Sequence, residues 1–228
     1  MACEVYARQS FLECLPDGER AVLLAMGLPR EWERGEALVR AGDRADSAIV
    51  LREGIAKIHR PAADGADVVL GLCGPGDLLG EITAVRDASR SATATALERV
   101  RAVVLPTPEL RSFLASHPHA SLALLDLALR RLYGADARRV EFATSETLGR
   151  VTSRLLELAD RFGRRLPDGT IDVELPINQE ELASWSASSR ESTARALRTL
   201  RELHLIQTHR LRLTVLDADR LRSHAARL

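Results

Sequence analysis

The chain has 228 residues, and its 32 basic and 32 acidic side chains cancel to a net charge of zero. This length suffices for two modest domains that each bury a core, and the charge balance excludes an overall basic field that would attract nucleic acid. From Arg150 onward, however, 14 arginines stand against 11 acidic residues, so the C-terminal part has three excess positive charges.

Near the N-terminus, Glu4 and Arg8 interrupt the sequence before an apolar run forms, which predicts no signal peptide. The most apolar stretch, residues 122–129, contains Asp126 and is too short to cross a bilayer. We therefore expect a cytoplasmic protein without a membrane partner.

Residues 10–27 predict short helices around a Pro-Asp-Gly turn, and the pattern then changes to short apolar runs separated by glycine turns. The strands expected from these runs cover residues 48–51, 55–58, 68–72 and 100–105. Many short strands at this spacing are typical of an antiparallel sandwich or jelly roll.

From Pro108 the apolar period becomes helical. The residues that recur at alternating steps of three and four are Leu122, Leu125, Leu129, Leu132, Asp136, Arg139 and Ala143. The four leucines form the a/d seam of a coiled coil, which the last residues make polar. The alternative is a helix packed onto its own domain. We expect a hinge at residues 142–149 and the first helix of a second domain at residues 150–163.

Residues 178–203 predict two short helices joined by a polar turn. Asn178 stands three residues before Glu181, and Ser188 stands three before Glu191, which is the spacing of a capping box at each helix start. Small alternating runs on both sides, around Asp168-Gly169 and at residues 205–217, predict two hairpins. Helices flanked in this way are typical of a winged helix-turn-helix.

In the second of these helices, Ala194, Leu197 and Leu200 predict a buried face, and arginines occupy the opposite side. A helix-turn-helix places this second helix in the DNA major groove, whereas an all-α protein could carry the same pattern as a solvated face. The side chains expected at the DNA interface are Asn178, Gln179, Ser188, Ser189, Arg190, Glu191, Thr193, Arg195, Arg198 and Arg210.

Residues 77–96 carry the groups that a phosphate-bearing nucleotide requires, because Gly80-Glu81 is followed by Arg90-Ser91-Ala92. A buried phosphate needs a fixed guanidinium together with a hydroxyl and backbone amides. A ribose hydroxyl needs a carboxylate acceptor, and close backbone approach needs glycine. The alternative is a surface arginine on a hairpin beside an unrelated glutamate.

With these motifs the chain resembles the cAMP receptor protein/FNR (CRP/FNR) superfamily of bacterial transcription regulators. The resemblance covers nearly the whole chain and includes the cassette GEITAVRDASRSA, Gly149-Arg150 at the hinge and SRESTAR in the second helix. It implies an α+β fold with three parts: a cyclic-nucleotide-binding β-roll, or jelly roll, at residues 1–118, a dimerisation helix and hinge at 119–145, and a winged helix-turn-helix at 146–228.

The resemblance also implies roles for single residues. Gly80 and Glu81 would hold the ribose of a cyclic nucleotide such as cAMP, while Arg90, Ser91 and the Ala92 amide would hold its phosphate. The full nucleotide site implied in this way is Gly80, Glu81, Ile82, Arg90, Ser91, Ala92, Arg131, Ala135 and Asp136.

For DNA, the resemblance implies a homodimer that reads a palindromic operator with TGTGA-like half-sites. Arg190, Glu191 and Arg195 match the base-reading trio of the family, which is chemically sound because arginine can bind guanine and glutamate can accept from cytosine. RNA polymerase would be a further partner.

Several positions depart from the family pattern. Ala135-Asp136 stands where cAMP-responsive members carry Thr-Ser, Ala187 replaces a glycine in the turn, and His209-Arg210 replaces a glycine at the wing tip. A carboxylate at Asp136 suits guanine, which offers two adjacent N–H donors. The effector could therefore be cAMP, a guanine nucleotide such as cGMP or a cyclic dinucleotide, or none, in which case the dimer would bind DNA constitutively.

An enzyme or redox sensor is the alternative from another class. A β-barrel metalloenzyme needs converging histidines, and the strand-rich region contains only His59. Cys3, Cys14 and Cys73 form no Cys-x-x-C pair, which argues against disulfides, a zinc site and an iron–sulfur cluster. We expect neither enzyme activity nor a bound metal.

Overall fold

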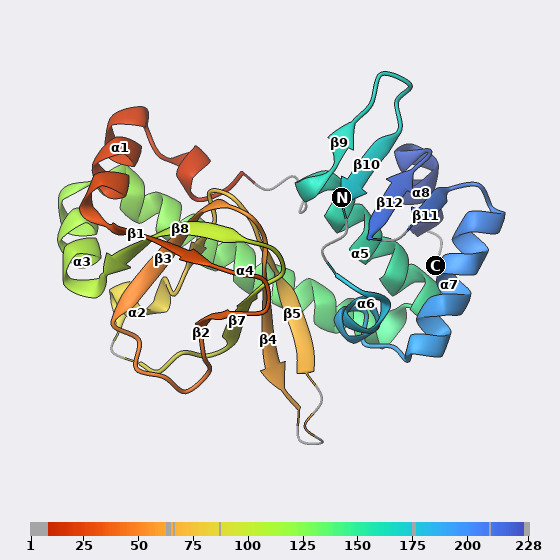
Figure 1. The fold of residues 1–228 in the computed structure, drawn as a ribbon, viewed down its shortest axis with the longest axis horizontal. Helices are drawn as coiled ribbons and strands as arrows, with labels where there is room; N and C mark the ends of the chain where they lie inside the picture. Colours follow the sequence, from red (N-terminus) through yellow and green to blue (C-terminus); the bar gives the residue numbers. More distant parts are fainter. Residues whose placement is uncertain are drawn as a thin grey trace. The chain divides into compact units, whose positions relative to one another are not determined.

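The computed structural model describes residues 9–62, 65, 67–86, 88–174, 177–209 and 211–225. Arg210, expected at the DNA interface, lies outside the described residues. The chain forms two compact units, one of residues 9–132 and one that contains residues 133–228 (Figure 1). The long helix α4 (Pro118–Thr144) contributes to both of them.

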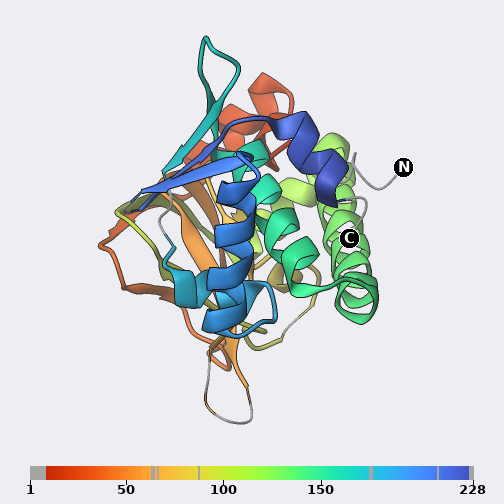
Figure 2. The ribbon, with the colours of Figure 1, turned by 90° about the vertical axis from the view of Figure 1, so that its right-hand side faces the viewer.

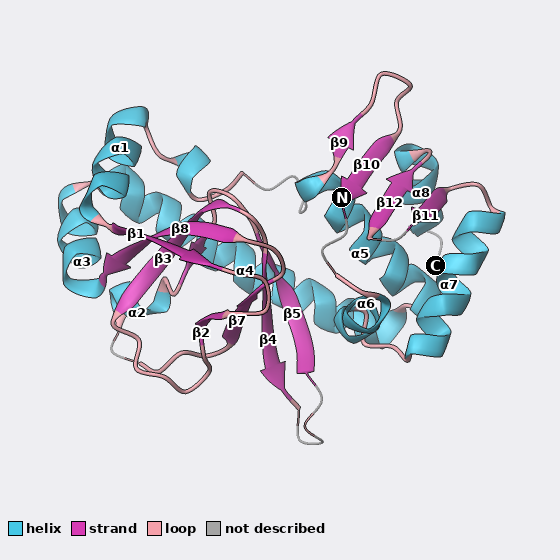
Figure 3. Cartoon of the chain, in the orientation of Figure 1, coloured by secondary structure: helices cyan, strands magenta, loops and turns pink. Residues whose placement is uncertain are grey.

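The first unit is a β-roll of two antiparallel sheets with the orders β1-β8-β3-β6 and β2-β7-β4-β5 (Figure 3). The strands of the first sheet are β1 (Leu28–Trp32), β3 (Ser47–Glu53), β6 (Leu78–Leu79) and β8 (Val100–Pro106). Those of the second are β2 (Ala37–Val39), β4 (Ala56–Pro61), β5 (Asp67–Cys73) and β7 (Thr93–Ala96). The four strands expected from the sequence are thereby confirmed.

Strand β3 shows how the roll is layered, because its apolar run is buried on both faces, as in central strands covered from two sides. Ile49 and Leu51 face the core between the two sheets. Ala48 and Val50 face a second core under the helices. These helices are the 3₁₀ turn η2 (Leu12–Cys14), α1 (Asp17–Met26), α3 (Thr107–Ser116) and the first half of α4.

Helix α4 has two apolar faces. Ala123, Leu124 and Leu127 are buried in the core under the helices. The seam leucines remain exposed in the single chain: Leu122, Leu125, Leu129 and Leu132. The helix therefore packs onto its own domain and still presents a second apolar stripe. Despite its 27 residues, α4 is not apolar enough to cross a membrane, and neither is any other described helix.

The second unit is a winged helix-turn-helix, as the sequence predicts. Its helices are α5 (Thr147–Phe162), α6 (Gln179–Trp185), α7 (Arg190–Glu202) and α8 (Ala218–Ala225). Its sheet has the order β11-β12-β10-β9, built from β9 (Arg164–Arg165), β10 (Ile171–Glu174), β11 (Ile206–His209) and β12 (Arg212–Val215). Helix α5 contacts α6, α7 and α8 (Figure 2). The break between α4 and α5 falls within the expected hinge.

The structure confirms the capping box of α6 and corrects that of α7. The Asn178 side chain accepts from the Glu181 amide at 2.9 Å, and the Glu181 carboxylate accepts from the Asn178 amide at 2.9 Å. Helix α7 begins one residue later than expected, because Ser189 is its cap and accepts from the Ser192 amide at 3.1 Å. The prediction of Ser188 as the cap is wrong.

The buried face of α7 also differs from the expectation. Leu197 and Leu200 are buried as predicted, but Ala194 is only half-buried. Thr193 and Ala196 complete the buried face instead. The stripe therefore follows steps of three and four, as a helix with 3.6 residues per turn requires.

The turn between α6 and α7 closes α6 with a Schellman motif around a left-handed residue. The Ala187 amide donates to Ser184 O at 3.1 Å, and the Ser188 amide donates to Ala183 O at 3.0 Å. Ala187 has φ of +46°, a conformation that L-residues other than glycine rarely adopt. The turn thus has the geometry of a glycine turn although its central residue is alanine.

We expect Ala187→Gly to stabilise the second unit by roughly 0.5–1 kcal/mol, because the relief of left-handed strain exceeds the entropy that glycine loses. Thermal unfolding followed by circular dichroism measures the change, with Ala183→Gly as the control. Ala183 lies inside α6 and is buried, so glycine there should lower the melting temperature. A lower melting temperature for Ala187→Gly would contradict the strain argument.

Candidate nucleotide site and DNA-binding helix

The predicted phosphate cassette runs from the end of β6 to the start of β7. Gly80 follows β6 with φ of +78°, which explains the glycine at this position. The chain then forms one short helix, α2 (Ile82–Val85), before it reaches Arg90. Arg90 therefore returns to the same end of the roll as Gly80.

The guanidinium of Arg90 lies directly against Gly80. A methyl group on Gly80 would overlap the Nη1 atom of Arg90. The loop before β3 fixes the Arg90 backbone, because the Arg90 amide donates to Asp43 O at 2.9 Å and the Gly42 amide donates to Arg90 O at 2.9 Å. Nη2 of Arg90 also donates to Ser47 Oγ at 3.2 Å. The guanidinium is thus held in place before any ligand arrives.

Arg90 carries a buried positive charge, since only 8% of the residue is exposed. Burial lowers the pKa of Arg90, and the nearby carboxylates of Asp46, Asp43 and Glu81 partly offset this effect. Among the described residues, no carboxylate forms an ion pair with the Arg90 guanidinium within 4.0 Å. An anion that reaches Arg90 would therefore find a fixed and desolvated cation.

Glu81, the expected ribose ligand, is bound to the long helix. Its carboxylate forms an ion pair with Nη1 of Arg131, and Nη2 of Arg131 donates to Leu78 O at 2.7 Å. The structure therefore brings together Gly80, Glu81, Arg90 and Arg131, all of which the sequence places in the nucleotide site. This ion pair also ties the cassette to α4.

The remaining residues of the expected nucleotide site are more exposed. Ser91 and Ala92 follow Arg90 directly and lead into β7, and Ile82 begins α2 with an exposed side chain. Ala135 and Asp136 lie on α4 within the other compact unit, where both are exposed. The Asp136 carboxylate accepts from Arg139 at 3.0 Å. Their contact with a nucleotide base stays a prediction.

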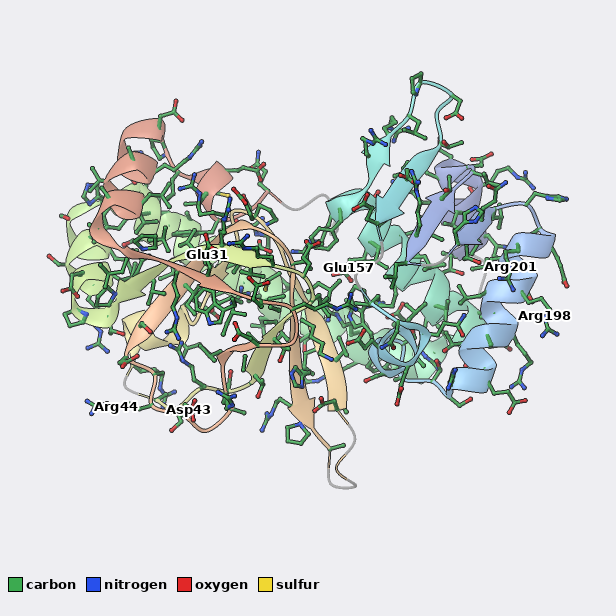
Figure 4. The ribbon with its side chains drawn as sticks, viewed as in Figure 1. Glu31, Asp43, Arg44, Glu157, Arg198 and Arg201 are labelled. Atoms are coloured by element: carbon green, nitrogen blue, oxygen red, sulfur yellow. The ribbon has the colours of Figure 1, made fainter. Side chains whose placement is uncertain are left out.

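Ser47 is a partner of Arg90 that the sequence does not reveal. It begins β3, whose residues Ile49 and Val50 pair with β6 just before Gly80. Only this register brings the Ser47 hydroxyl to the Arg90 guanidinium. No motif in the sequence marks Ser47. The charged residues Asp43 and Arg44 lie in the loop before β3 (Figure 4).

The outer side of α7 carries the arginines expected to contact DNA. The exposed residues of the set are Arg190, Glu191, Arg195 and Arg198 on α7, Ser189 at its cap, and Asn178 and Gln179 at the start of α6. Figure 4 shows Arg198 and Arg201 on the outer side of the helix. Within the described part of the chain, neither Arg190 nor Arg198 has an ion-pair partner.

Two members of the expected DNA-binding set behave differently. Nη1 of Arg195 donates to the Glu191 carboxylate at 2.5 Å, and Nη2 donates to Ser192 Oγ at 2.8 Å, so this side chain is preorganised. Thr193 is fully buried, and its hydroxyl bonds that of Ser188 at 2.8 Å. The structure therefore places Thr193 in the interior of the motif, contrary to the expectation of an exposed DNA contact.

Two family models match the chain: the cyclic nucleotide-binding domain over residues 29–117 and the Crp-like helix-turn-helix domain over residues 149–224. A CRP-like cAMP-activated global transcriptional regulator of Mycobacterium tuberculosis is 30% identical over 97% of this chain and 99% of that protein. The chain belongs to the CRP/FNR superfamily of transcription regulators.

Two solved structures have the same fold. A CRP-family transcriptional regulator of Thermus thermophilus is 28% identical and superposes with a TM-score of 0.71, over 86% of this chain and 96% of that chain. FixK2 of Bradyrhizobium japonicum has a TM-score of 0.76 at 15% identity, with the same coverage of 86% and 96%. The β-roll, the long helix and the winged helix-turn-helix are thus shared across distant sequences.

Proposed function

We propose that the chain acts in the cytoplasm as a homodimeric, sequence-specific DNA-binding regulator that a cyclic nucleotide controls. Nucleotide binding is assigned to residues 1–118, dimerisation to 119–145 and DNA binding to 146–228. The observation that carries the proposal is the buried Arg90 guanidinium, held against Gly80 without an ion-pair partner among the described residues. Such an arrangement suits a singly charged phosphodiester.

The other pocket groups suit the sugar of the nucleotide. Glu81 can accept a hydrogen bond from a ribose hydroxyl, and Arg131 neutralises the carboxylate in the absence of ligand. A ribose that contacts Glu81 would change the ion pair between Glu81 and Arg131. Because Arg131 belongs to α4, this change would be transmitted to that helix. The Ser91 hydroxyl and the Ala92 amide follow Arg90 and can add donors to the phosphate.

Cyclic AMP is the first candidate effector, because the Mycobacterium tuberculosis relative is described as cAMP-activated. A guanine nucleotide, cGMP or a cyclic dinucleotide, is the second, because the Asp136 carboxylate can accept two N–H donors of guanine. In this structure Asp136 bonds Arg139, which a guanine base would have to displace.

Isothermal titration calorimetry tests the effector. The purified protein is titrated with cAMP, cGMP and a cyclic dinucleotide, with 5′-AMP as the open-chain control. We expect one cyclic nucleotide to bind at one site per chain, and 5′-AMP to bind more weakly because of its second charge. If none binds and the protein still selects its operator, the regulator acts without a small-molecule effector.

The DNA half of the proposal rests on α7 and α4. The exposed arginines of α7 suit the major groove, and the exposed leucine seam of α4 suits a second copy of the chain. Paired recognition helices imply a palindromic operator, for which TGTGA-like half-sites are the first to test. RNA polymerase is the further partner expected of a regulator that binds at promoters.

We expect Arg195→Ala to weaken operator binding by about 1–3 kcal/mol, because arginine binds guanine O6 and N7 with two hydrogen bonds. Gel-shift titrations on operator and scrambled duplexes measure the loss. Arg201→Ala is the control, since it removes the same charge from the last turn of α7. Arg201→Ala should weaken binding to the operator and to the scrambled duplex equally. An unchanged preference for the operator in Arg195→Ala would contradict base reading by Arg195.

A further inference from the structure

The guanidinium of Arg150 connects two segments that are 39 residues or more apart in the chain. It donates to four oxygen atoms: Ser145 O from Nη1 at 2.5 Å, Thr147 Oγ1 from Nη2 at 3.3 Å, Ser186 O from Nε at 2.8 Å and Ala187 O from Nη2 at 3.2 Å. The first two belong to the hinge between α4 and α5. The last two belong to the turn between α6 and α7.

The carbonyl groups of the turn that accept from Arg150 lie at a helix end and at a left-handed residue. Ser186 and Ala187 close α6, where carbonyl groups lack helical partners and the helix dipole is negative. Ala187 is left-handed, and such strain persists only where the surroundings determine the conformation. Arg150 binds the carbonyl of this residue and the one before it. The direction in which α7 leaves the turn therefore depends on Arg150.

A pocket lies beside the start of α5 and α7, although the two helices are also in contact. It is lined on one side by Glu146, Thr147, Leu148 and Arg150 and on the other by Ser192, Arg195, Ala196 and Thr199. The hydrogen bonds of Arg150 to the turn add a second connection to this packing.

A second arginine, one turn further along α5, makes the same kind of connection. Arg154 is fully buried, and Nη2 donates to the Glu141 carboxylate of α4 at 2.6 Å. Its guanidinium also lies 5.6 Å from the ring centre of Trp185 in α6. Glu157, labelled in Figure 4, accepts from Nη1 at 3.5 Å. Both arginines thus join the end of α4 to the end of α6.

We infer that Arg150 is a positioning residue that sets the orientation of α7 from the end of α4. The inference rests on the proposed function, since it assigns the route by which a change at the hinge reaches the DNA-binding helix. Arg150 needs no contact with a base. Replacing Arg150 loosens the turn. Helix α7 then loses its fixed direction, although it keeps all of its own arginines.

Arg150→Gln is compared with Arg164→Gln, which removes the same charge from an exposed position on β9. Hydrogen–deuterium exchange on the full chain reports the turn directly. We expect amides of residues 186–189 to exchange at least roughly tenfold faster in Arg150→Gln only, because the turn loses two charged hydrogen bonds. Trp32→Phe leaves Trp185 as the single tryptophan, and its fluorescence reports whether α6 has shifted.

DNA binding separates positioning from simple charge loss. Arg150→Gln should lower affinity for the operator by about tenfold and leave affinity for scrambled duplex equal to that of Arg164→Gln. Arg150→Lys, which keeps the charge without the planar fork, should be intermediate, and it replaces Arg150→Gln if that variant does not fold.

Unchanged exchange at residues 186–189 overturns the inference, and so does faster exchange with unchanged operator preference. If the wild-type chain selects no duplex, the proposed function fails instead. The exchange rates and the Trp185 fluorescence of Arg150→Gln then decide by themselves whether Arg150 fixes the turn, because neither measurement needs DNA.

Discussion

Replacing Leu125 and Leu129 together by glutamate is expected to abolish the proposed dimer without unfolding the chain. Both side chains are exposed in the single chain, Leu125 to 56% and Leu129 to 41%, so the β-roll loses little packing. In a dimer each chain would bury both leucines. Burial of one leucine contributes about 1.5–3 kcal/mol, so the double change should weaken dimerisation by roughly 6 kcal/mol, on the order of 10,000-fold.

Analytical ultracentrifugation measures the change, and circular dichroism confirms that the fold persists. The control, Val22→Glu with Leu28→Glu, adds the same charge at exposed apolar positions of α1 and β1. This control should remain dimeric and bind the operator as the wild type does. If the α4 variant dimerises with the same affinity as the wild type, the interface lies elsewhere. The affinity for a palindromic duplex should then also be unchanged.

Most of the fold follows from periodicity and turn chemistry. Strands β3, β4, β5 and β8 of the β-roll, the long helix, the hinge and the winged helix-turn-helix lie where apolar periods change or glycine occurs, whereas β1, β2, β6 and β7 were not expected from the sequence. The capping box at Asn178 was predictable because its two partners are three residues apart. Ser188 and Ser189 are both good caps, and the hydroxyl contact between Ser188 and Thr193 selects Ser189.

The contacts that sequence reasoning missed join segments distant in the chain. Ser47 reaches Arg90 through the register of β3 with β6, and Arg150 reaches Ser186 through the packing of α5 on α6. Arg90 could be found because it follows Gly80-Glu81 within one cassette, and Arg150 because it follows Gly149 at the hinge. The partners of these arginines are a serine hydroxyl and backbone carbonyls, which have no sequence signature.

Arg90→Leu is expected to weaken the proposed nucleotide binding by at least about 100-fold in Kd, because two charged hydrogen bonds to phosphate are lost. Stability should change little or improve, since an apolar side chain replaces a buried cation. Arg90→Lys keeps the charge but cannot form the planar fork, so its loss should be smaller. Calorimetry with the effector found for the wild type measures both variants.

The control is Arg86→Leu, which removes an exposed arginine from the end of α2 in the same cassette. It should bind nucleotide as the wild type does, because its loss changes only a screened surface charge. Gly80→Ala provides an independent check, since the added methyl group would displace the Arg90 guanidinium. Loss of binding in Gly80→Ala with retained binding in Arg86→Leu would show that the position of the Arg90 charge, and not the net charge of the cassette, holds the phosphate. Equal losses in all variants would instead favour a nonspecific electrostatic attraction.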